Sequence, residues 1–260
     1  MQHHYVNRKS RMDRHFLWRG AMAAQGVPVR DMTRHIAKDK DDYSDVQSLC
    51  EAARADFPEF FSFHLESPQS HIGFGHLICS WSVMRMWRSI ASGNETACAW
   101  LDDYALRVPQ RDVVDLITGV DAEMVMLAWH ERPDIFDENV YGLPASVLPP
   151  LPKCVSRVPQ VPSLFRGALG GSDWAIIFSP AGAGAVLQFM ADMPYFNTEL
   201  APVAYYFTRR SDGVFSVRGN DAGENGTVPL RRNRWVVHLW DYTDGETSDL
   251  IGLHEGVSHD

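Results

Sequence analysis

Residues 98–106 read CAWLDDYAL, an apolar run that ends on two adjacent carboxylates, Asp102 and Asp103, before apolar residues return. The run TACAWL at 96–101 shows no alternation of apolar and polar residues, which is typical of a strand covered on both faces by helices. Ligands of open α/β sheets bind at the carboxyl ends of such strands. The stretch therefore predicts an α/β fold whose sheet delivers both carboxylates to a ligand-binding edge.

Strand-like and helical patterns alternate along the rest of the chain. We expect one domain over 1–260 with a mostly parallel central sheet flanked by helices, and a mixed C-terminal part. Ser179 and Pro180 have the residue types of a helix cap and a first helical position. The predicted strands are 3–7, 27–32, 96–101, 123–129, 173–179, 202–208, 213–219 and 234–240, and the predicted helices are 10–25, 45–55, 75–93, 112–119 and 180–192.

Three segments break this alternation. The charged stretch 35–70 is interpreted as a surface insertion that holds one helix, and 209–260 as a C-terminal extension. The segment 131–165 is rich in proline and has little periodicity. A loop of that length is usually functional, so it is a candidate lid or acceptor-binding loop, with a proline-stiffened crossing segment as the alternative.

Composition narrows the class of protein. The chain has 260 residues, 45% of them apolar, and a formal net charge of −9. That charge counts against a partner with a nucleic-acid backbone without excluding one, since arginines cluster at 8–19 and 231–234. The four cysteines are far apart and are interpreted as reduced packing residues. With neither a secretory signal nor a membrane-spanning apolar run, we expect a cytoplasmic protein.

The aspartate pair has a chemical interpretation and a structural one. Two close carboxylates repel each other unless a cation or hydrogen-bond donors compensate them. A divalent ion such as Mg²⁺ or Mn²⁺ prefers oxygen ligands and often shares its shell with substrate phosphates. The structural alternative is a pair of solvated turn residues, one of which caps the next helix.

Three stretches around the pair resemble a known family. They are YVNRKSRMDR at 5–14, IGFGHLICSWSVMRMWRSIASGNETACAWLDDYAL at 72–106 and GGSDWAIIFSPAGAGAVLQFM at 170–190. Their order and layout resemble glycosyltransferases of the lipooligosaccharide and collagen galactosyltransferase type, family twenty-five, which have the GT-A fold. This sequence departs from that pattern at Val83, where the family has His, and at Leu101, where it has Glu.

The resemblance implies transfer of a sugar, a hexose in particular, from a nucleotide-sugar donor to a hydroxyl acceptor with inversion. A UDP-sugar is the implied donor and Mn²⁺ or Mg²⁺ the implied metal. Asp103 would bind the metal, and Asp102 would contact metal, ribose or sugar. A late histidine, His238 or else His254, would complete the metal shell, although His238 could equally be a core residue. The residues implied for nucleobase and diphosphate binding are Val6, Asn7, Arg11 and Arg14.

Inversion also requires a base that takes the proton of the acceptor hydroxyl. The family carries an acidic residue shortly after the Ser-Pro helix, and Glu199 is the nearest match here, with Asp192 and Asp173 as rivals. The alternative for Glu199 is a first-turn glutamate at a helix N-terminus.

Other functions stay open from the sequence. The same chemistry could act on a hydroxylated nucleic-acid base or on a protein side chain. The departures at Val83 and Leu101 favour a non-catalytic relative that binds a nucleotide or glycan. A metal-dependent phosphoesterase would need a second cluster of His and Asp ligands, which the sequence does not offer at convincing spacing.

Overall fold

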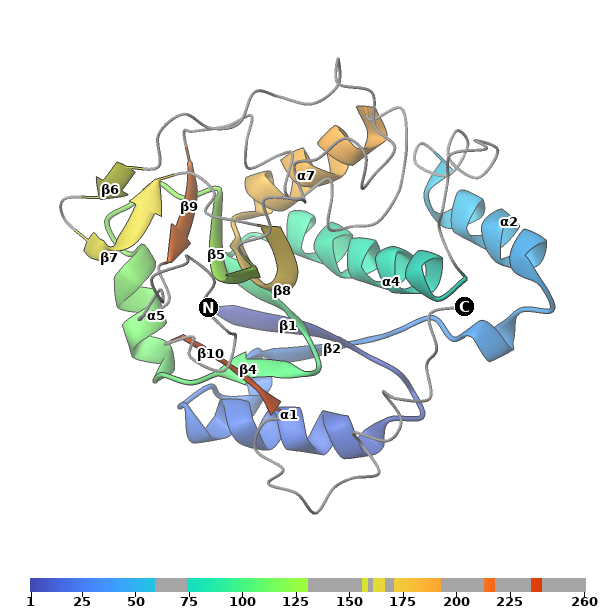
Figure 1. Cartoon of the computed structure of the whole chain (residues 1–260), viewed down its shortest axis with the longest axis horizontal. Helices are drawn as coiled ribbons and strands as arrows, with labels where there is room; N and C mark the ends of the chain where they lie inside the picture. Colours follow the sequence, from blue (N-terminus) through green and yellow to red (C-terminus); the bar gives the residue numbers. More distant parts are fainter. Residues whose placement is uncertain are drawn as a thin grey trace.

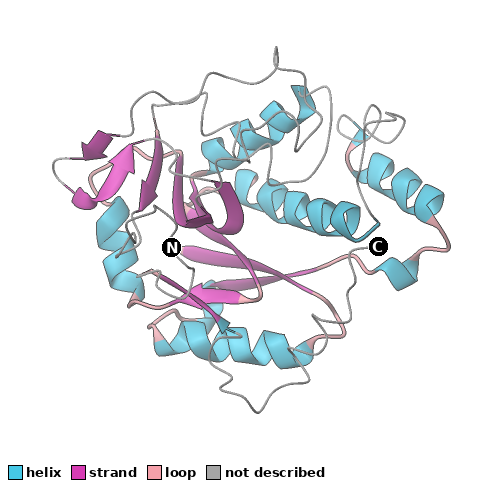
Figure 2. Ribbon diagram, viewed as in Figure 1, coloured by secondary structure: helices cyan, strands magenta, loops and turns pink. Residues whose placement is uncertain are grey.

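The computed structural model describes residues 1–58, 74–130, 156–158, 161–166, 171–192, 213–217 and 235–239. These residues form a sheet with helices on both faces (Figures 1 and 2). No helix among them combines the length and the apolar character that a membrane crossing requires.

The main sheet has eight described strands in the order β2-β1-β3-β8-β5-β9-β7-β6. Six of them (β2, β1, β3, β5, β9 and β6) run in one direction, and β8 and β7 run in the other. The bounds are β1 (Gln2–Asn7), β2 (Met32–Ile36), β3 (Ala97–Leu101), β5 (Met124–His130), β6 (Ser156–Val158), β7 (Val161–Arg166), β8 (Gly171–Phe178) and β9 (Val214–Val217). The predicted α/β class with a mostly parallel, helix-flanked sheet is confirmed.

Helices cover the two faces of the sheet with separate cores. The helices are α1 (Met12–Ala24), α2 (Val46–Asp56), α4 (Phe74–Ala91), α5 (Gln110–Ile117) and α7 (Pro180–Asp192), with the short 3-10 turns η1 (Val29–Asp31) and η2 (Lys40–Asp42). Trp81 and Trp87 of α4 pack with α7 on one face, and Trp18 of α1 packs with α5 on the other. In β3, Ala99 joins the first core and Trp100 the second. Both faces of β3 are buried, which explains its uninterrupted apolar run.

Two structural details differ from the sequence expectation. The second strand was expected at 27–32, but residues 29–31 form η1 and β2 begins only at Met32. Part of the segment 131–165, expected to be a loop, forms the antiparallel pair β6 and β7. β7 also pairs with β9, whose residues lie about fifty positions later, so the local pattern did not reveal these strands.

The segment expected to be a C-terminal extension also contributes strands. β9 lies inside the main sheet between β5 and β7. Further along, β10 (Val236–His238) pairs with β4 (Tyr104–Leu106) in a separate two-stranded ribbon. The strand predicted at 202–208 lies outside the described residues.

The start of α7 is packed tightly against the chain before β5. Ser179 caps the helix as predicted, because its Oγ accepts a hydrogen bond of 3.0 Å from the backbone N–H of Gly182. A Cβ added at Gly182 would lie 2.0 Å from the backbone oxygen of Glu123, whereas one at Gly184 would meet only the Ala91 Cβ at 3.9 Å. Glycine at 182 is therefore required by the close approach of two backbones.

We expect Gly182→Ala to lower the free energy of unfolding by about 1–3 kcal/mol, because backbone atoms must shift to admit the methyl group. Gly184→Ala, two residues along the same helix, should raise it by about 0.5–1 kcal/mol through helix propensity. Urea denaturation of both variants checks this. Equal destabilisation by the two substitutions would contradict it.

Candidate donor-binding site

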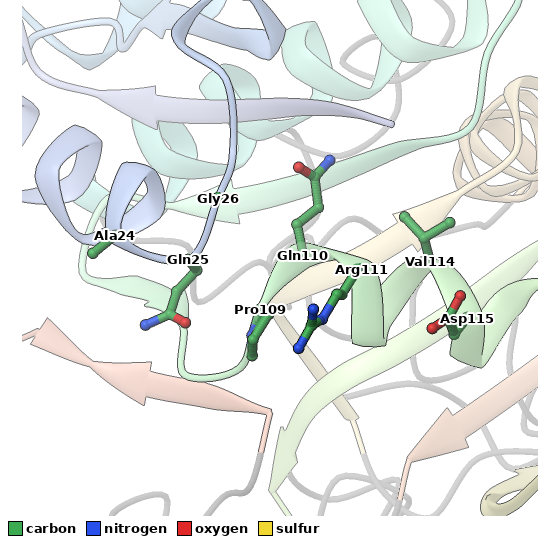
Figure 3. Close-up of a pocket in the computed structure, with 8 residues that line it drawn as sticks. All are labelled: Ala24, Gln25, Gly26, Pro109, Gln110, Arg111, Val114 and Asp115. Atoms are coloured by element: carbon green, nitrogen blue, oxygen red, sulfur yellow. The ribbon is translucent and has the colours of Figure 1, made fainter.

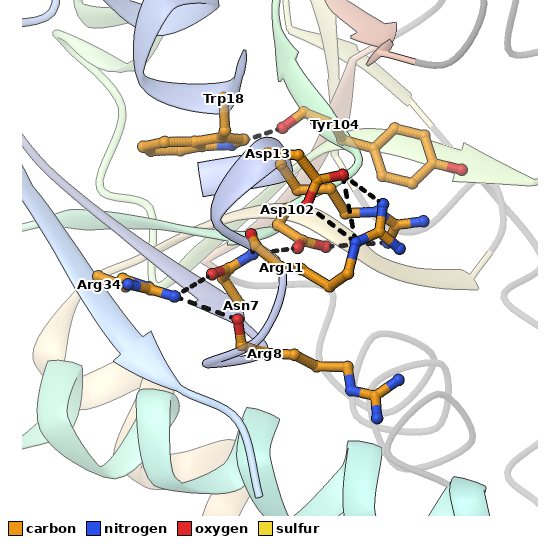
Figure 4. A network of polar contacts seen from close by, with 9 residues as sticks. Asn7, Arg8, Arg11, Asp13, Trp18, Arg34, Asp102 and Tyr104 are labelled. Carbon is orange, nitrogen blue, oxygen red and sulfur yellow. Dashed lines mark hydrogen bonds and ion pairs between the residues drawn. The ribbon is translucent and has the colours of Figure 1, made fainter. Parts of the chain in front are cut away.

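The carboxyl ends of β1 and β3 bring together two stretches that are far apart in sequence. The strands are parallel neighbours, with Val6 opposite Leu101, so Asn7 and Asp102 follow at the same edge. The Asn7 Nδ2 donates to Asp102 Oδ2 at 2.6 Å (Figure 4). The structure thus joins the N-terminal motif to the aspartate pair, as the resemblance implies.

Asn7 organises this edge. Only 1% of its surface is exposed. Its amide also donates to the backbone oxygen of Arg11 at 3.1 Å, and its Oδ1 accepts from Arg34 Nη2 at 2.5 Å. Arg34 donates as well to the Arg8 backbone oxygen (Figure 4). One buried amide therefore connects β1, β2, the start of α1 and the aspartate turn.

Arginines surround the aspartate turn. Arg14 Nη1 lies 3.5 Å from Asp102 Oδ1, and both side chains are largely buried. Arg11 forms a two-pronged pair with Asp13, and Arg8 forms one with Asp39. Each of these three arginines therefore has a carboxylate partner at this edge.

Burial and a second carboxylate disfavour the ionised form of Asp102, so Asp102 is a strained carboxylate in the electrostatic sense. Burial raises its pKa, and the neighbouring Asp103 raises it further, while the Asn7 amide, Arg14 and Arg11 act in the opposite direction. Burial likewise lowers the pKa of Arg14, although the charge of Asp102 opposes that effect. A cation placed beside the two carboxylates would favour the ionised form of Asp102.

The aspartate turn, Asp102 and Asp103 between β3 and β4, and Tyr104 after it receive hydrogen bonds from α1 and from the residue that follows β10. Trp18, fully buried on α1, donates its indole N–H to the Tyr104 backbone oxygen at 2.8 Å. The backbone N–H of Leu239 donates to the backbone oxygen of Asp103 at 2.7 Å, and His238 pairs with Tyr104 in the β10–β4 ribbon. The backbone of the late strand thus runs beside Asp103, which places the predicted His238 next to the pair in the fold.

The other predicted site residues are distributed as follows. The Val6 side chain is largely buried in the α4-side core, the apolar cluster between α4 and the sheet. The backbone places Asp173 in β8 and Asp192 at the end of α7. Glu199 and His254 lie outside the described residues. Within the described part of the chain, no three His, Cys, Asp or Glu side chains are arranged to hold a metal ion.

Two arginines at this edge were not among the predicted ligands. Arg34 was missed because the second strand was expected to end before it, and Arg8 was noted only as part of a basic cluster. The signal that could have found Arg34 is its place in β2, where it pairs with Tyr5 two residues before Asn7.

Another pocket lies away from this edge. It measures about 640 Å³ and lies between the end of α1 and the start of α5 (Figure 3). Gln110, one of its lining residues, donates to the backbone oxygen of Met1, which precedes β1. The pocket is therefore at the amino end of β1, opposite the edge that carries Asp102.

The raised pKa of Asp102 predicts a pH-dependent effect of Asp102→Asn. A carboxyl whose pKa is raised by folding stabilises the folded state only while it is protonated. That contribution is lost as the pH rises from the ordinary pKa of the group through its raised pKa. Asp102→Asn should therefore increase the free energy of unfolding at pH 7, with a gain that shrinks toward pH 4. Denaturant unfolding across this range measures the difference.

Asp13→Asn is the matched control of opposite sign. The hydrogen bond from Arg11 lowers the pKa of Asp13 to about 2. Its contribution is present above its ordinary pKa and is lost only as pH falls toward 2. Asp13→Asn should therefore be slightly destabilising at pH 7, and a loss of stability in Asp102→Asn at pH 7 would refute the assignment of strain to Asp102.

Comparisons with known proteins show little relation at the level of sequence. No protein-family model matches the chain, and no curated protein matches it. Among solved structures it is similar to the apo form of mouse xyloside xylosyltransferase 1, at 10% identity and a TM-score of 0.37. That match covers 81% of this chain and 69% of the mouse chain. Residue roles in this chain therefore rest on its own geometry.

Proposed function

We propose that this chain is a metal-dependent glycosyltransferase that moves a hexose from a nucleotide-sugar, a UDP-sugar first among them, to a hydroxyl acceptor with inversion. The observation that supports it is the contact between Asn7 and Asp102 at the carboxyl edge of the sheet. It joins two motifs of the resemblance, 95 positions apart, into one polar site bordered by arginines.

The oxygen atoms of the aspartate pair suit a hard divalent cation. Two adjacent carboxylates supply oxygen ligands, which Mg²⁺ and Mn²⁺ prefer. Both carboxylate oxygens of Asp102 already face partners, Asn7 on one side and Arg14 on the other. Asp103 is the principal metal ligand in this proposal, with His238 as its companion from β10, and Asp102 is a positioned carboxylate that also contacts the sugar donor.

The surrounding residues divide the remaining tasks. Arg14 and Arg11 would bind and orient the diphosphate, and Asn7 holds Asp102 in place. A bound metal would supply Lewis-acid stabilisation of the departing diphosphate. Trp18 and the β10 backbone keep the aspartate turn rigid, which preserves the geometry that transfer requires.

The acceptor proton requires a base, and Glu199 is proposed for that role, with Asp173 and Asp192 as alternatives. A carboxylate on the face of the sugar opposite the diphosphate would take the proton as the acceptor oxygen attacks. A glycan or other small hydroxyl acceptor fits the net charge of −9 better than DNA does.

A binding-only relative is the second candidate, and one observation favours it. Val83, where the family has His, is fully buried in the α4-side core and contributes no polar group. The neighbouring Ser82 is also buried, and its Oγ accepts from the Lys38 backbone N–H at 2.9 Å. This region therefore has a structural role, and nucleotide binding without transfer would fit it.

Thermal melts with UDP, GDP, CMP and their sugars, with and without Mn²⁺, test the donor site. A ligand that binds the folded chain stabilises it by about 2.7 kcal/mol at a hundredfold excess over Kd. We expect one nucleotide class to stabilise the chain more strongly with Mn²⁺, and Asp103→Ala to remove the Mn²⁺-dependent part. Asp112→Ala on α5 is the control and should leave both effects intact. If no nucleotide stabilises the chain with metal present, the proposal fails.

Glu199→Gln separates transfer from binding. It should lower kcat by about 10²–10⁴-fold, the usual contribution of a general base, while nucleotide-induced stabilisation stays unchanged. Release of nucleoside diphosphate in the presence of candidate acceptors measures kcat. An unchanged rate would move the base assignment to Asp173 or Asp192, and no transfer by the unaltered chain despite nucleotide binding would favour the binding-only relative.

A further inference from the structure

A second cavity lies along the outer edge of the sheet, between β2 and α4. It has a volume of about 530 Å³, within the usual range for small-molecule sites. Its lining includes Arg34, Arg85 and Arg88 together with three serines, and none of its eight lining residues is acidic. In a chain of net charge −9, this groove is a local concentration of positive charge.

The arginines of α4 that line the groove outnumber the carboxylates described beside them. Among the described residues, Arg85 and Arg88 share one carboxylate, that of Asp56 at the end of α2, with Arg85 Nε 3.3 Å from Asp56 Oδ2. Burial acts to raise the pKa of Asp56, but hydrogen bonds from Arg88 and Trp81 bring it below its ordinary value. Asp56 is therefore ionised at neutral pH, and two guanidinium charges face one carboxylate.

Both guanidinium groups remain accessible to a ligand. The side chains of Arg85 and Arg88 are 40% and 44% exposed. Arg88 is also held over the Phe57 ring, 4.0 Å from its centre, which limits its rotamers. Part of the cost of ordering these side chains is thus already met before a ligand arrives.

Hydroxyl groups and a neutral imidazole complete the lining. Ser89 and Ser92 lie at the end of α4, and Ser92 Oγ donates to the Arg88 backbone oxygen at 2.9 Å. Burial, with smaller effects of His4 and Arg85, lowers the pKa of His35 to about 4. His35 is therefore uncharged at pH 7, and the arginines alone supply the positive charge.

We propose that this groove is a second binding site, separate from the donor site, for a phosphorylated small molecule whose phosphate is held by Arg85 and Arg88 with the α4 hydroxyls. The planar guanidinium fork matches phosphate oxygens and forms strong charge-assisted hydrogen bonds. Arg34 borders the groove on one side and donates to Asn7 on the other, so the two sites are neighbours. The inference stands independently of sugar transfer.

Isothermal titration of the full chain with pyrophosphate, in EDTA and at low ionic strength, tests the site. Chelation removes any metal contribution at Asp103, and low salt preserves the electrostatic attraction. Arg85→Gln should weaken binding by about tenfold, the value of one charge-assisted hydrogen bond. Arg30→Gln, an exposed arginine on η1 outside the groove, is the matched control and should bind as the unaltered chain does.

Two more variants make the assignment specific. Asp56→Asn removes the carboxylate that competes for the arginines and should tighten pyrophosphate binding, which keeps the test informative should Arg85→Gln fail to fold. Arg14→Gln reports whether pyrophosphate binds in the donor site instead. Absence of binding by the unaltered chain would overturn the inference, as would a loss of affinity in Arg14→Gln with none in Arg85→Gln, because the anion would then be in the donor site.

Discussion

The hydrogen bond from the buried Asn7 amide to Asp102 is the interaction on which the candidate site depends. It connects the ends of β1 and β3 at the carboxyl edge of the sheet. Asp102 is poorly solvated and lies beside a second carboxylate, so its ionised form requires donors from elsewhere in the chain. Asn7 and Arg14 provide them, and Arg34 in turn fixes the orientation of the Asn7 amide. The site is thus specified by contacts among three strands and one helix rather than by the aspartates alone.

The class of fold was accessible from sequence because it depends on local patterns of apolar residues. The uninterrupted apolar run before Asp102 predicted a strand buried on two faces. Asn7, Arg11 and Arg14 were assigned to the same site only by the family resemblance, and their binding roles stay predictions. Pairing direction was not accessible in this way. β8 has the same apolar character as β3 and β5 yet runs opposite to both, since strand direction is decided by distant connections. The start of β2 was displaced for a related reason: residues 29–31 carry no signal that separates a 3-10 turn from a strand.

The contributions of single side chains could likewise be predicted only in part, because they depend on contacts between distant residues. Asn7 was predicted as a ligand residue, but its part as a buried connector appears only once Arg34 and Asp102 are placed on either side of it. The groove beside α4 was invisible in sequence, because its arginines come from a helix that reads as a core element with a few surface charges. Arg85 and Arg88 are brought together by their ion pairs with Asp56, which lies about thirty residues earlier.

The position of β8 also has a consequence for how the chain folds. β8 fills the gap between β3 and β5, and it is made about seventy residues after β3 is complete. Until Gly171–Phe178 has emerged during synthesis, one edge of β3 and both edges of β5 have no partner in the sheet, because β9 is made later still. Both strands are strongly apolar. Open apolar edges of this kind pair readily with other chains. The growing chain is therefore most prone to association in the interval between β5 and β8. β8 ends that interval by joining β3 to β5, and β9 later covers the other edge of β5.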